Sequence, residues 1–411
     1  MDPRNMDKKG LIDAATKRIF SLGPRDLASA LAYENMRYGL GKMIYASDDL
    51  EAFCVFGPDA TITRNVGRWD SGYGYGAIIK WSDKGLYFPE LRPNACGMVL
   101  ARIDEMPSKE RVIEGISRMS DSEISLDGVR IRPDFGHGNH FFEFYSVLES
   151  SPDVEGDLSK EGNYVLLHGS APEKKEEFYA ETRETGLIET PLGPVSVLDG
   201  TAGKNYYKKW ELLKDFSMRR RELLLKEILG EFKVVSNLVH QGLFARNEVR
   251  LGCYDAMQNG NGRCGLLYPV ALRWDLPLYV FKGRENLSEE VIARVGFKER
   301  AESLGIMDRL KGVNILPHGG GYKVDVEYTK ISVVDTGKGR HFILRGAKPA
   351  SSVSEMIETS QRGVSGFGEM VIMNPRELPY DYRGMSVVEK TMEYGLGSPV
   401  AKLQPLMTFK V

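Results

Sequence analysis

Four of the six histidines in this chain stand beside a short apolar run and small residues. His140 directly precedes the aromatic run Phe141–Val147, whereas the other three follow apolar runs; they are His168, His240 and His318. Runs of this length and composition predict buried β-strands. A histidine at the end of a strand can reach a metal or a phosphate in a cleft. This recurrence is the strongest constraint on what the chain can form, because histidines taken singly are more often structural.

The alternation of these strands with helical patterns predicts a mixed α/β (α+β) fold. Apolar residues with helical spacing occupy Lys8–Phe20 and Tyr206–Leu229, where Gly230 ends the second helix, and Asn286–Gly305 is predicted to form another helix. The chain has 411 residues, of which 42% are hydrophobic and 27% are charged, and this is enough for a large core. No linker or internal repeat divides the chain, so residues 1–411 are predicted to form one large domain with central mixed sheets around a cleft.

Composition also limits the cellular setting and the partners. No apolar run approaches the length that crosses a bilayer, so no membrane partner is expected. The four cysteines have no paired spacing and follow no signal peptide, which predicts free thiols and a cytoplasmic protein. The net charge is −2, so a nucleic-acid partner would need a local basic patch. The triplet Arg219–Arg221 is one candidate for such a contact, although a solvated helix face is its more common role.

A set of soft donors, with one cysteine and three histidines, is a candidate metal site. Thiolate and imidazole suit zinc, manganese, cobalt or iron, and the sequence does not choose among them. The residues lie far apart in the chain, and no local motif such as Cys-x-x-Cys supports the set. The alternative is that each histidine is structural and that the cysteine is a small buried apolar residue. The four candidates are Cys96, His140, His168 and His240.

His318 is followed by three glycines, Gly319, Gly320 and Gly321. Glycine leaves the backbone N–H groups open to an anion such as a phosphate. The histidine itself could be a metal ligand, a general base, or a nucleophile that accepts a phosphoryl or nucleotidyl group. A metal beside it would neutralise phosphate charge and orient the leaving group.

Several segments, in the same order along nearly the whole chain, resemble the motifs of the RtcB-type RNA ligases, the GTP- and manganese-dependent enzymes of tRNA splicing and RNA repair. The most specific are Gly138–Glu143, which is similar to the family's Gly-Asn-His-Phe-x-Glu signature, and Ala401–Lys410, which is similar to its C-terminal Ala-x-Leu-x-Pro-Leu motif and lysine. The other matching segments are Cys96–Met98, His168–Ser170, Val239–Gln241, His318–Gly321 and Tyr380–Arg383.

For the fold and the site, the resemblance implies a single RtcB-like domain whose cleft binds GTP and one or two Mn²⁺ ions. The catalytic residues would be His318, which becomes guanylylated, Asn139, which binds phosphate, and Lys410, which contacts the nucleotide. Phe141 and Glu143 would hold the guanine. The residues that the resemblance assigns to nucleotide binding are Asn139, Phe141, Glu143, His318, Gly319, Gly320, Gly321 and Lys410. Those that it assigns to the metal are Cys96, His140, His168 and His240.

The reaction that the resemblance implies joins two RNA ends. The guanylyl group would activate an RNA 3′-phosphate, formed from a 2′,3′-cyclic phosphate, for attack by a 5′-hydroxyl. The RNA would be tRNA halves or other broken RNA, and the resemblance allows for an archease-type activator protein.

The chain departs from the family in ways that bear on metal and RNA binding. Pro93, with Asn94 beside it, stands where the family has an aspartate ligand. Cys253–Met257 replaces a His-Arg-Lys-Gly-Ala segment, Tyr322 replaces an arginine, and Ala and Pro after Ser170 replace Arg-Gly. The chain is also shorter than typical ligases. Because several changes remove positive charge that would meet RNA phosphates, the alternative is a homologue without ligase activity, either a nucleotide- or RNA-binding protein or a metal-dependent RNA end-processing hydrolase.

Overall fold

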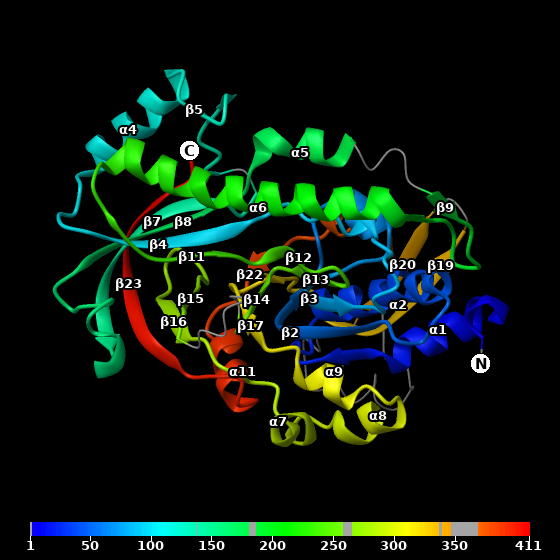
Figure 1. The fold of residues 1–411 in the computed structure, drawn as a ribbon. Coiled ribbons are helices and arrows are strands. Elements are labelled where there is room, and N and C mark those ends of the chain that lie inside the picture. The colour runs from blue at the N-terminus through cyan, green and yellow to red at the C-terminus, as the bar shows by residue number, and fades with distance from the viewer. Residues whose placement is uncertain (1, 137, 181–185, 258–264, 337–338, 347–368) are drawn as a thin grey trace.

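The computed structural model describes residues 2–136, 138–180, 186–257, 265–336, 339–346 and 369–411. Within them the chain forms a mixed α/β fold with two large β-sheets, one of seven strands and one of five. The predicted mixed fold class is therefore confirmed. The sheets lie side by side, and the long helix α6 (Gly200–Leu229) runs across both of them (Figure 1). The largest apolar cluster joins the two sheets, because it contains Phe56 and Ile79 of one and Val99 and Leu167 of the other.

The seven-stranded sheet is antiparallel throughout and curls into a nearly closed barrel. Its edge strands β11 and β15 lie close together, which almost closes the sheet on itself. Side chains from six of its strands meet in one buried cluster that includes Leu100, Tyr145, Leu166, Val280 and Leu403. In spatial order its strands are β11 (Lys233–Val239), β4 (Gly97–Ile103), β8 (Asn163–Gly169), β7 (Phe141–Ser150), β23 (Pro399–Phe409), β16 (Leu278–Lys282) and β15 (Leu267–Val270).

The five-stranded sheet is covered by helices on both faces. Alternate residues of a strand point to opposite faces. Accordingly Cys54 and Phe56 join the cluster that contains the α1 and α2 side chains, whereas Phe53 and Val55 join the cluster of α7, α8 and α9. The strands, in spatial order, are β1 (Ile19–Ser21), β2 (Phe53–Thr61), β3 (Tyr75–Lys80), β13 (Glu248–Leu251) and β12 (Gln241–Ala245). The helices are α1 (Lys8–Lys17), α2 (Leu27–Ser47), α7 (Glu289–Arg294), α8 (Lys298–Ser303) and α9 (Met307–Lys311).

Three helix predictions need correction. The helix predicted over Lys8–Phe20 ends at Lys17 as α1, and Ile19 and Phe20 lie in strand β1 instead. Helix α6 begins six residues before the predicted start, at Gly200, although it ends before Gly230 as predicted, where a φ of 89° favours glycine. The single helix predicted over Asn286–Gly305 is wrong, because the chain turns at Gly296 with a φ of 75° and forms α7 and α8 instead. No helix in the described part of the chain has the length and apolar character that a bilayer crossing requires.

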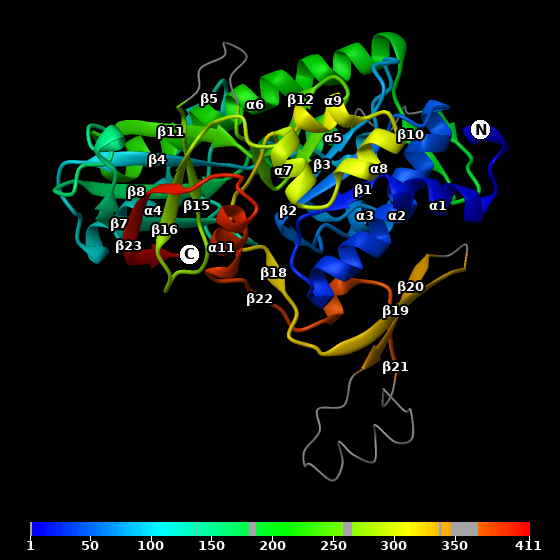
Figure 2. The same ribbon diagram turned by 90° about the horizontal axis from the view of Figure 1, so that it is seen from below.

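A three-stranded sheet of β19 (Tyr328–Asp335), β20 (Arg340–Gly346) and β21 (Glu369–Ile372) stands out from the body as an arm (Figure 2). One face of the arm packs on α2 through Phe342 and Leu344. Of the four cysteines, Cys54, Cys96 and Cys253 are free and Cys264 lies outside the described residues. The remaining elements are η1 (Pro3–Asn5), α3 (Val66–Asp70), η2 (Pro89–Leu91), α4 (Lys109–Asp121), β5 (Ser125–Leu126), β6 (Val129–Arg130), η3 (Pro152–Val154), α5 (Pro172–Ala180), β9 (Gly186–Ile188), β10 (Val195–Val197), β14 (Cys253–Asp255), β17 (Ile315–Pro317), β18 (Tyr322–Lys323), η5 (Pro375–Glu377), β22 (Asp381–Tyr382) and α11 (Ser386–Glu393).

Candidate metal and nucleotide site

Strand pairing brings three of the predicted metal ligands to one edge of the seven-stranded sheet. Cys96 directly precedes β4, whose first residue pairs with the last residue of β8. His168 lies near that end of β8 and pairs with Phe141, the first residue of β7. His140 precedes β7. Because antiparallel neighbours place the start of one strand beside the end of the next, the three residues lie together although they are far apart in sequence.

His240 is the single residue between β11 of one large sheet and β12 of the other. Its backbone N–H donates to the carbonyl oxygen of Cys96 at 2.9 Å. Its own carbonyl oxygen accepts from the N–H groups of Gly252 and Cys253, at 2.9 and 3.1 Å. These bonds fix His240 at the junction of the two sheets, next to Cys96.

The donor atoms of Cys96, His168 and His240 converge in a buried group and lie within 4.8 Å of one another. The Cys96 sulphur is 3.2 Å from Nε2 of His168, and the two Nε2 atoms of His168 and His240 are 3.3 Å apart. His140 stands beside this group, with Nε2 at 3.5 Å from the Cys96 sulphur. The structure therefore brings all four predicted ligands together, and three of them face one point. We call these four residues the Cys96 cluster.

Hydrogen bonds on the far side of two rings orient the cluster. Nδ1 of His168 donates to the carbonyl oxygen of Asn139 at 2.9 Å, and Nδ1 of His140 lies 2.6 Å from Asp134. Burial lowers the pKa of His168 and favours its neutral form, and a neutral ring that donates from Nδ1 presents a lone pair on Nε2. Lone pairs of imidazole and a thiolate that meet in a buried space repel one another unless a cation or a proton lies between them. This donor set therefore fits a divalent transition metal.

Charges in the cluster stabilise one another. Burial alone would raise the pKa of Cys96, but the adjacent imidazoles of His168 and His140 outweigh burial and hold that pKa well below its usual value. Burial likewise opposes a charged His140, but Cys96 and Asp134 raise the pKa of His140 to about 9. Despite burial, His140 and Arg220 lower the pKa of Asp134 to about 2. A thiolate is thus the favoured form of Cys96, as a metal ligand requires.

His318 lies beside the Cys96 cluster and is held by an aspartate that sequence reasoning missed. Its ring centre is 4.3 Å from that of His240. Asp59 on β2 accepts from both Nδ1 and the backbone N–H of His318, at 3.0 and 3.2 Å. Nε2 is therefore the ring nitrogen left for the cleft. A signal did exist, because a carboxylate inside the otherwise buried run of β2 is unusual unless it has a partner.

The glycines after His318 have a packing role in addition to any binding role. A Cβ atom on Gly319 would meet the carbonyl oxygen of Ala271 at 2.5 Å, and one on Gly320 would meet that of Arg383 at 2.2 Å. Gly321 has a φ of 65°, which favours glycine. Larger side chains would push the His318 segment away from its neighbours, so these residues place His318. Anion binding by their amides stays a prediction.

A cleft of about 1390 Å³ opens in front of the Cys96 cluster. All eight residues predicted to bind nucleotide line it: Asn139, Phe141, Glu143, His318, Gly319, Gly320, Gly321 and Lys410. Of the predicted metal ligands, His168 forms part of its wall. Burial raises the pKa of Glu143 to about 7, although Thr408 and Tyr145 donate hydrogen bonds to this carboxylate. Asn94, which also lines the cleft, accepts from the backbone N–H of Cys96 at 3.0 Å.

Of the triplet Arg219–Arg221, a candidate for a nucleic-acid contact, two residues are unavailable to a ligand, and neither lies on a solvated helix face. Arg220 and Arg221 are fully buried on α6. Arg220 donates to Asp134 and Glu173, at 3.1 and 2.9 Å, and thereby supports His140 from behind. Arg221 donates to the carbonyl oxygen of Gly169 at 3.2 Å. A basic triplet on a helix cannot show which of its members face the core.

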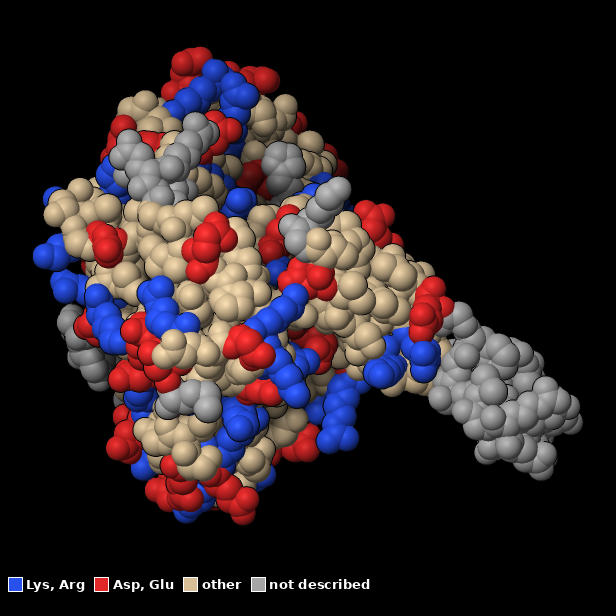
Figure 3. Space-filling model, turned by 90° about the vertical axis from the view of Figure 1, so that its right-hand side faces the viewer, with Lys and Arg blue, Asp and Glu red and all other residues tan. Residues whose placement is uncertain are grey.

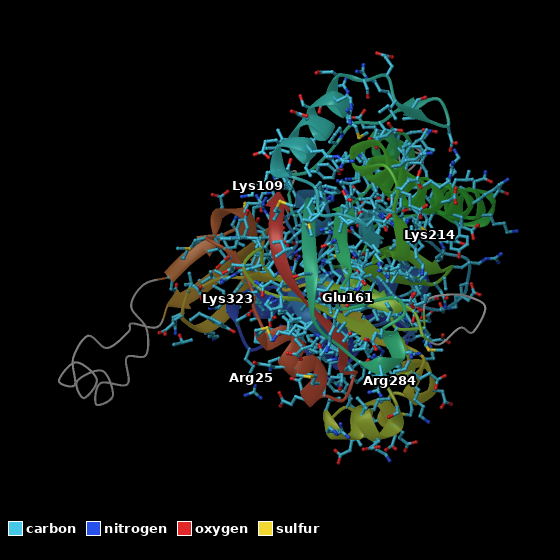
Figure 4. The ribbon with its side chains drawn as sticks, turned by 90° about the vertical axis from the view of Figure 1, so that its left-hand side faces the viewer. Arg25, Lys109, Glu161, Lys214, Arg284 and Lys323 are labelled. Atoms are coloured by element: carbon cyan, nitrogen blue, oxygen red, sulfur yellow. The ribbon has the colours of Figure 1, made fainter. Side chains whose placement is uncertain are left out.

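Positive charge gathers instead on the cleft wall, from residues scattered through the sequence. On the molecular face shown in Figure 3, Lys and Arg side chains are interspersed with Asp and Glu. The acidic residues of the cleft wall are Glu143, Asp275 and Asp381. Its basic residues are Arg64, Arg68, Lys109, Arg273, Arg376 and Lys410. Lys109 lies near the red strand β23 in Figure 4. The excess of cations contrasts with the net charge of −2 of the whole chain.

No known family model matches this chain, and no curated protein matches it.

Proposed function

We propose that this protein is a metal-dependent RNA ligase of the RtcB type, in which His318 accepts a guanylyl group from GTP. The observation that carries the proposal is the position of His318. Its ring is held by Asp59, stands beside a buried thiolate–imidazole cluster and forms part of the wall of a cationic cleft. A nucleophile held by a carboxylate, next to a metal site, is the arrangement that nucleotidyl transfer needs.

In the first step Nε2 of His318 attacks the α-phosphorus of GTP. A nitrogen–phosphorus bond forms, the bond from the α-phosphorus to the oxygen that bridges to the β-phosphate breaks, and pyrophosphate leaves with the electron pair. Nδ1 keeps its proton and donates a hydrogen bond to Asp59 at 3.0 Å. The carboxylate stabilises the positive charge that develops on the ring, in the way that an aspartate supports a catalytic histidine elsewhere.

Cys96, His168 and His240 would hold Mn²⁺, with His140 beside the sulphur. When bound, one or two such ions would neutralise phosphate charge next to His318. Asn139 and the glycines would bind phosphate, Phe141 and Glu143 the guanine, and Lys410 the nucleotide. All of them line the cleft.

In the second step an oxygen of an RNA 3′-phosphate attacks the guanylyl phosphorus and releases His318. The 5′-hydroxyl of the other RNA end then attacks the activated 3′-phosphate, and GMP leaves. Tyrosine and alanine residues replace arginines of the family, but Arg64, Lys109 and Arg376 would supply positive charge to the cleft wall for RNA phosphates. Location in the cytoplasm and help from an archease-type activator belong to the same proposal.

The first test is incubation with Mn²⁺ and α-labelled GTP, followed by denaturing electrophoresis. Wild type is expected to carry an acid-labile covalent label that His318→Ala lacks. His341→Ala is the matched control, because His341 is on strand β20 of the arm. A folded wild-type protein that takes no label would contradict guanylylation and favour the nucleotide- or RNA-binding protein or the hydrolase.

The ligand set has a separate test. Elemental analysis of Cys96→Ala is expected to show loss of the bound metal, since the sulphur is central to the donor group. Metal content equal to that of wild type would contradict the assignment.

A further inference from the structure

The four tryptophans of this chain fall into two kinds. Trp69, Trp81 and Trp210 are buried, and each donates its indole N–H to a backbone carbonyl oxygen. Trp274 is 72% exposed, and it lines the cleft. A large amphipathic ring left in water at the wall of a binding cleft is typical of a contact residue.

The turn that carries Trp274 is fixed, and it is tied to the nucleophile segment. It connects β15 with β16 and is closed by a hydrogen bond from the N–H of Leu276 to the carbonyl oxygen of Arg273, at 3.0 Å. Arg273 also forms a bidentate ion pair with Asp275, at 2.9 and 2.7 Å. These contacts bridge the turn on both sides of Trp274, whose ring is left exposed.

At the start of the same turn, the N–H of Ala271 donates to the carbonyl oxygen of His318 at 3.2 Å, and Ala271 forms a β-bridge with Gly319. Two residues separate Ala271 from Trp274, so three Cα-to-Cα steps limit their Cα separation to roughly 11 Å. The indole ring is therefore within reach of the last nucleotides of a strand whose end lies at His318.

The charges of the cleft wall to which Trp274 belongs favour a nucleic-acid strand as the occupant. Arg273 is balanced by Asp275 and Asp381, and Arg68 is buried. The positive charge that the cleft wall offers therefore comes from Arg64, Lys109, Arg376 and Lys410. Ile113 and Leu406, which are 53% and 47% exposed, add apolar surface to the same wall. Aromatic rings combined with a cationic groove are the features with which proteins bind single strands, because every unpaired base offers a face for stacking.

We propose that Trp274 stacks on an unpaired nucleobase near the end of the strand that reacts at His318. This inference rests on the proposed function and adds to it the form of the substrate. A base inside a duplex presents no free face, so the cleft selects single-stranded ends.

The exposed indole supplies its own probe. In wild type, a short single-stranded RNA with a 3′-phosphate is expected to quench the tryptophan emission, and Trp274→Phe is expected to lose that response while it retains binding. In Trp274→Ala, RNA affinity measured by fluorescence anisotropy is expected to fall roughly 5- to 150-fold, which corresponds to one stacked base. Leu212→Ala, an exposed apolar change on α6, is the matched control and is expected to bind as wild type does.

Three results would overturn the proposal: equal RNA affinity of Trp274→Ala and wild type, equal loss in Trp274→Phe and Trp274→Ala, or binding of a blunt duplex as tight as that of the single strand. Quenching of the tryptophan emission by GTP without RNA would also overturn it, because the guanine of GTP would then be the base that stacks on Trp274. Labelling of His318 in the same wild-type preparation separates the two ideas. If His318 is labelled but substitution of Trp274 does not change RNA affinity, the stacking site alone is rejected. If RNA quenches the tryptophan emission but His318 takes no label, the stacking site is supported and guanylylation is rejected.

Discussion

The Cys96 cluster and the cleft wall in front of it are built in opposite ways. The cluster is buried, and hydrogen bonds and ion pairs from other buried groups hold its members; Arg220, for example, holds Asp134, which holds His140. The wall carries long exposed side chains such as Lys109 and the free ring of Trp274. The difference teaches that chemistry and substrate choice can be changed separately: a change behind the cluster disturbs fold and metal, whereas a change on the wall disturbs binding.

The largest effect is expected from Arg220→Met, behind the cluster. The substitution leaves the buried carboxylate of Asp134 and the partly buried one of Glu173 without their cation, so the free energy of unfolding should fall by about 3–5 kcal/mol. Urea denaturation measures it. The neighbouring Arg219→Met is the control, because Arg219 forms exposed ion pairs with Asp127 and Asp215 and should cost less than about 1 kcal/mol. An equal loss of unfolding free energy in the two variants would show that the groups behind the cluster contribute no more to stability than exposed ion pairs do.

Glu143 combines a property of each region, since it is buried like the Cys96 cluster and yet lines the cleft. Burial raises its pKa from 4.5 to about 7, so between these values the native state holds a proton that the unfolded chain has released. The free energy of unfolding should therefore fall by roughly 3 kcal/mol as the pH rises through this range. Urea denaturation of Glu143→Gln at several pH values should show this slope removed. A slope unchanged by the substitution would show that other groups cause it.

Asp134→Asn sharpens the comparison by removing a charge and leaving the shape. The ring of His140 would lose its anionic partner at 2.6 Å, so metal affinity should fall about 10- to 100-fold. Competition with a chelating dye measures the affinity. Asp127→Asn, an exposed carboxylate in an ion pair with Arg219, should bind metal as wild type does. Metal affinity of Asp134→Asn equal to that of wild type would mean that His140 does not depend on this contact.

The smallest effect is expected on the wall. Lys109→Ala should leave the free energy of unfolding within about 0.5 kcal/mol of wild type. RNA affinity should fall a few-fold, and the slope of log affinity against log salt should decrease by about 1, as for one lost phosphate contact. Lys208→Ala, exposed on α6, should change neither quantity. An unchanged salt slope in Lys109→Ala would show that the RNA strand does not contact this side of the cleft wall.

Sequence reasoning succeeded where the information is local. Histidines beside short apolar runs were expected at strand ends, and the structure places His140, His168, His240 and His318 there and brings them together. It failed where the partner is remote: Asp59 meets His318 across 259 positions, and Arg220 meets Asp134 across 86. No local pattern encodes such pairs, because strand pairing and helix packing create them. The same limit hid which arginines of Arg219–Arg221 are buried.

The one-residue link at His240 has a consequence for how this chain can vary. Strands β11 and β12 belong to different sheets, and the backbone of His240 is bonded to both sides of the junction. Inserting or deleting one residue between Val239 and Gln241 would reverse the facing of every later side chain in β12, because successive residues of a strand alternate. A change of length at this position would therefore move His240 away from Cys96 and His168, and it would expose the side chains of β12 that are now buried.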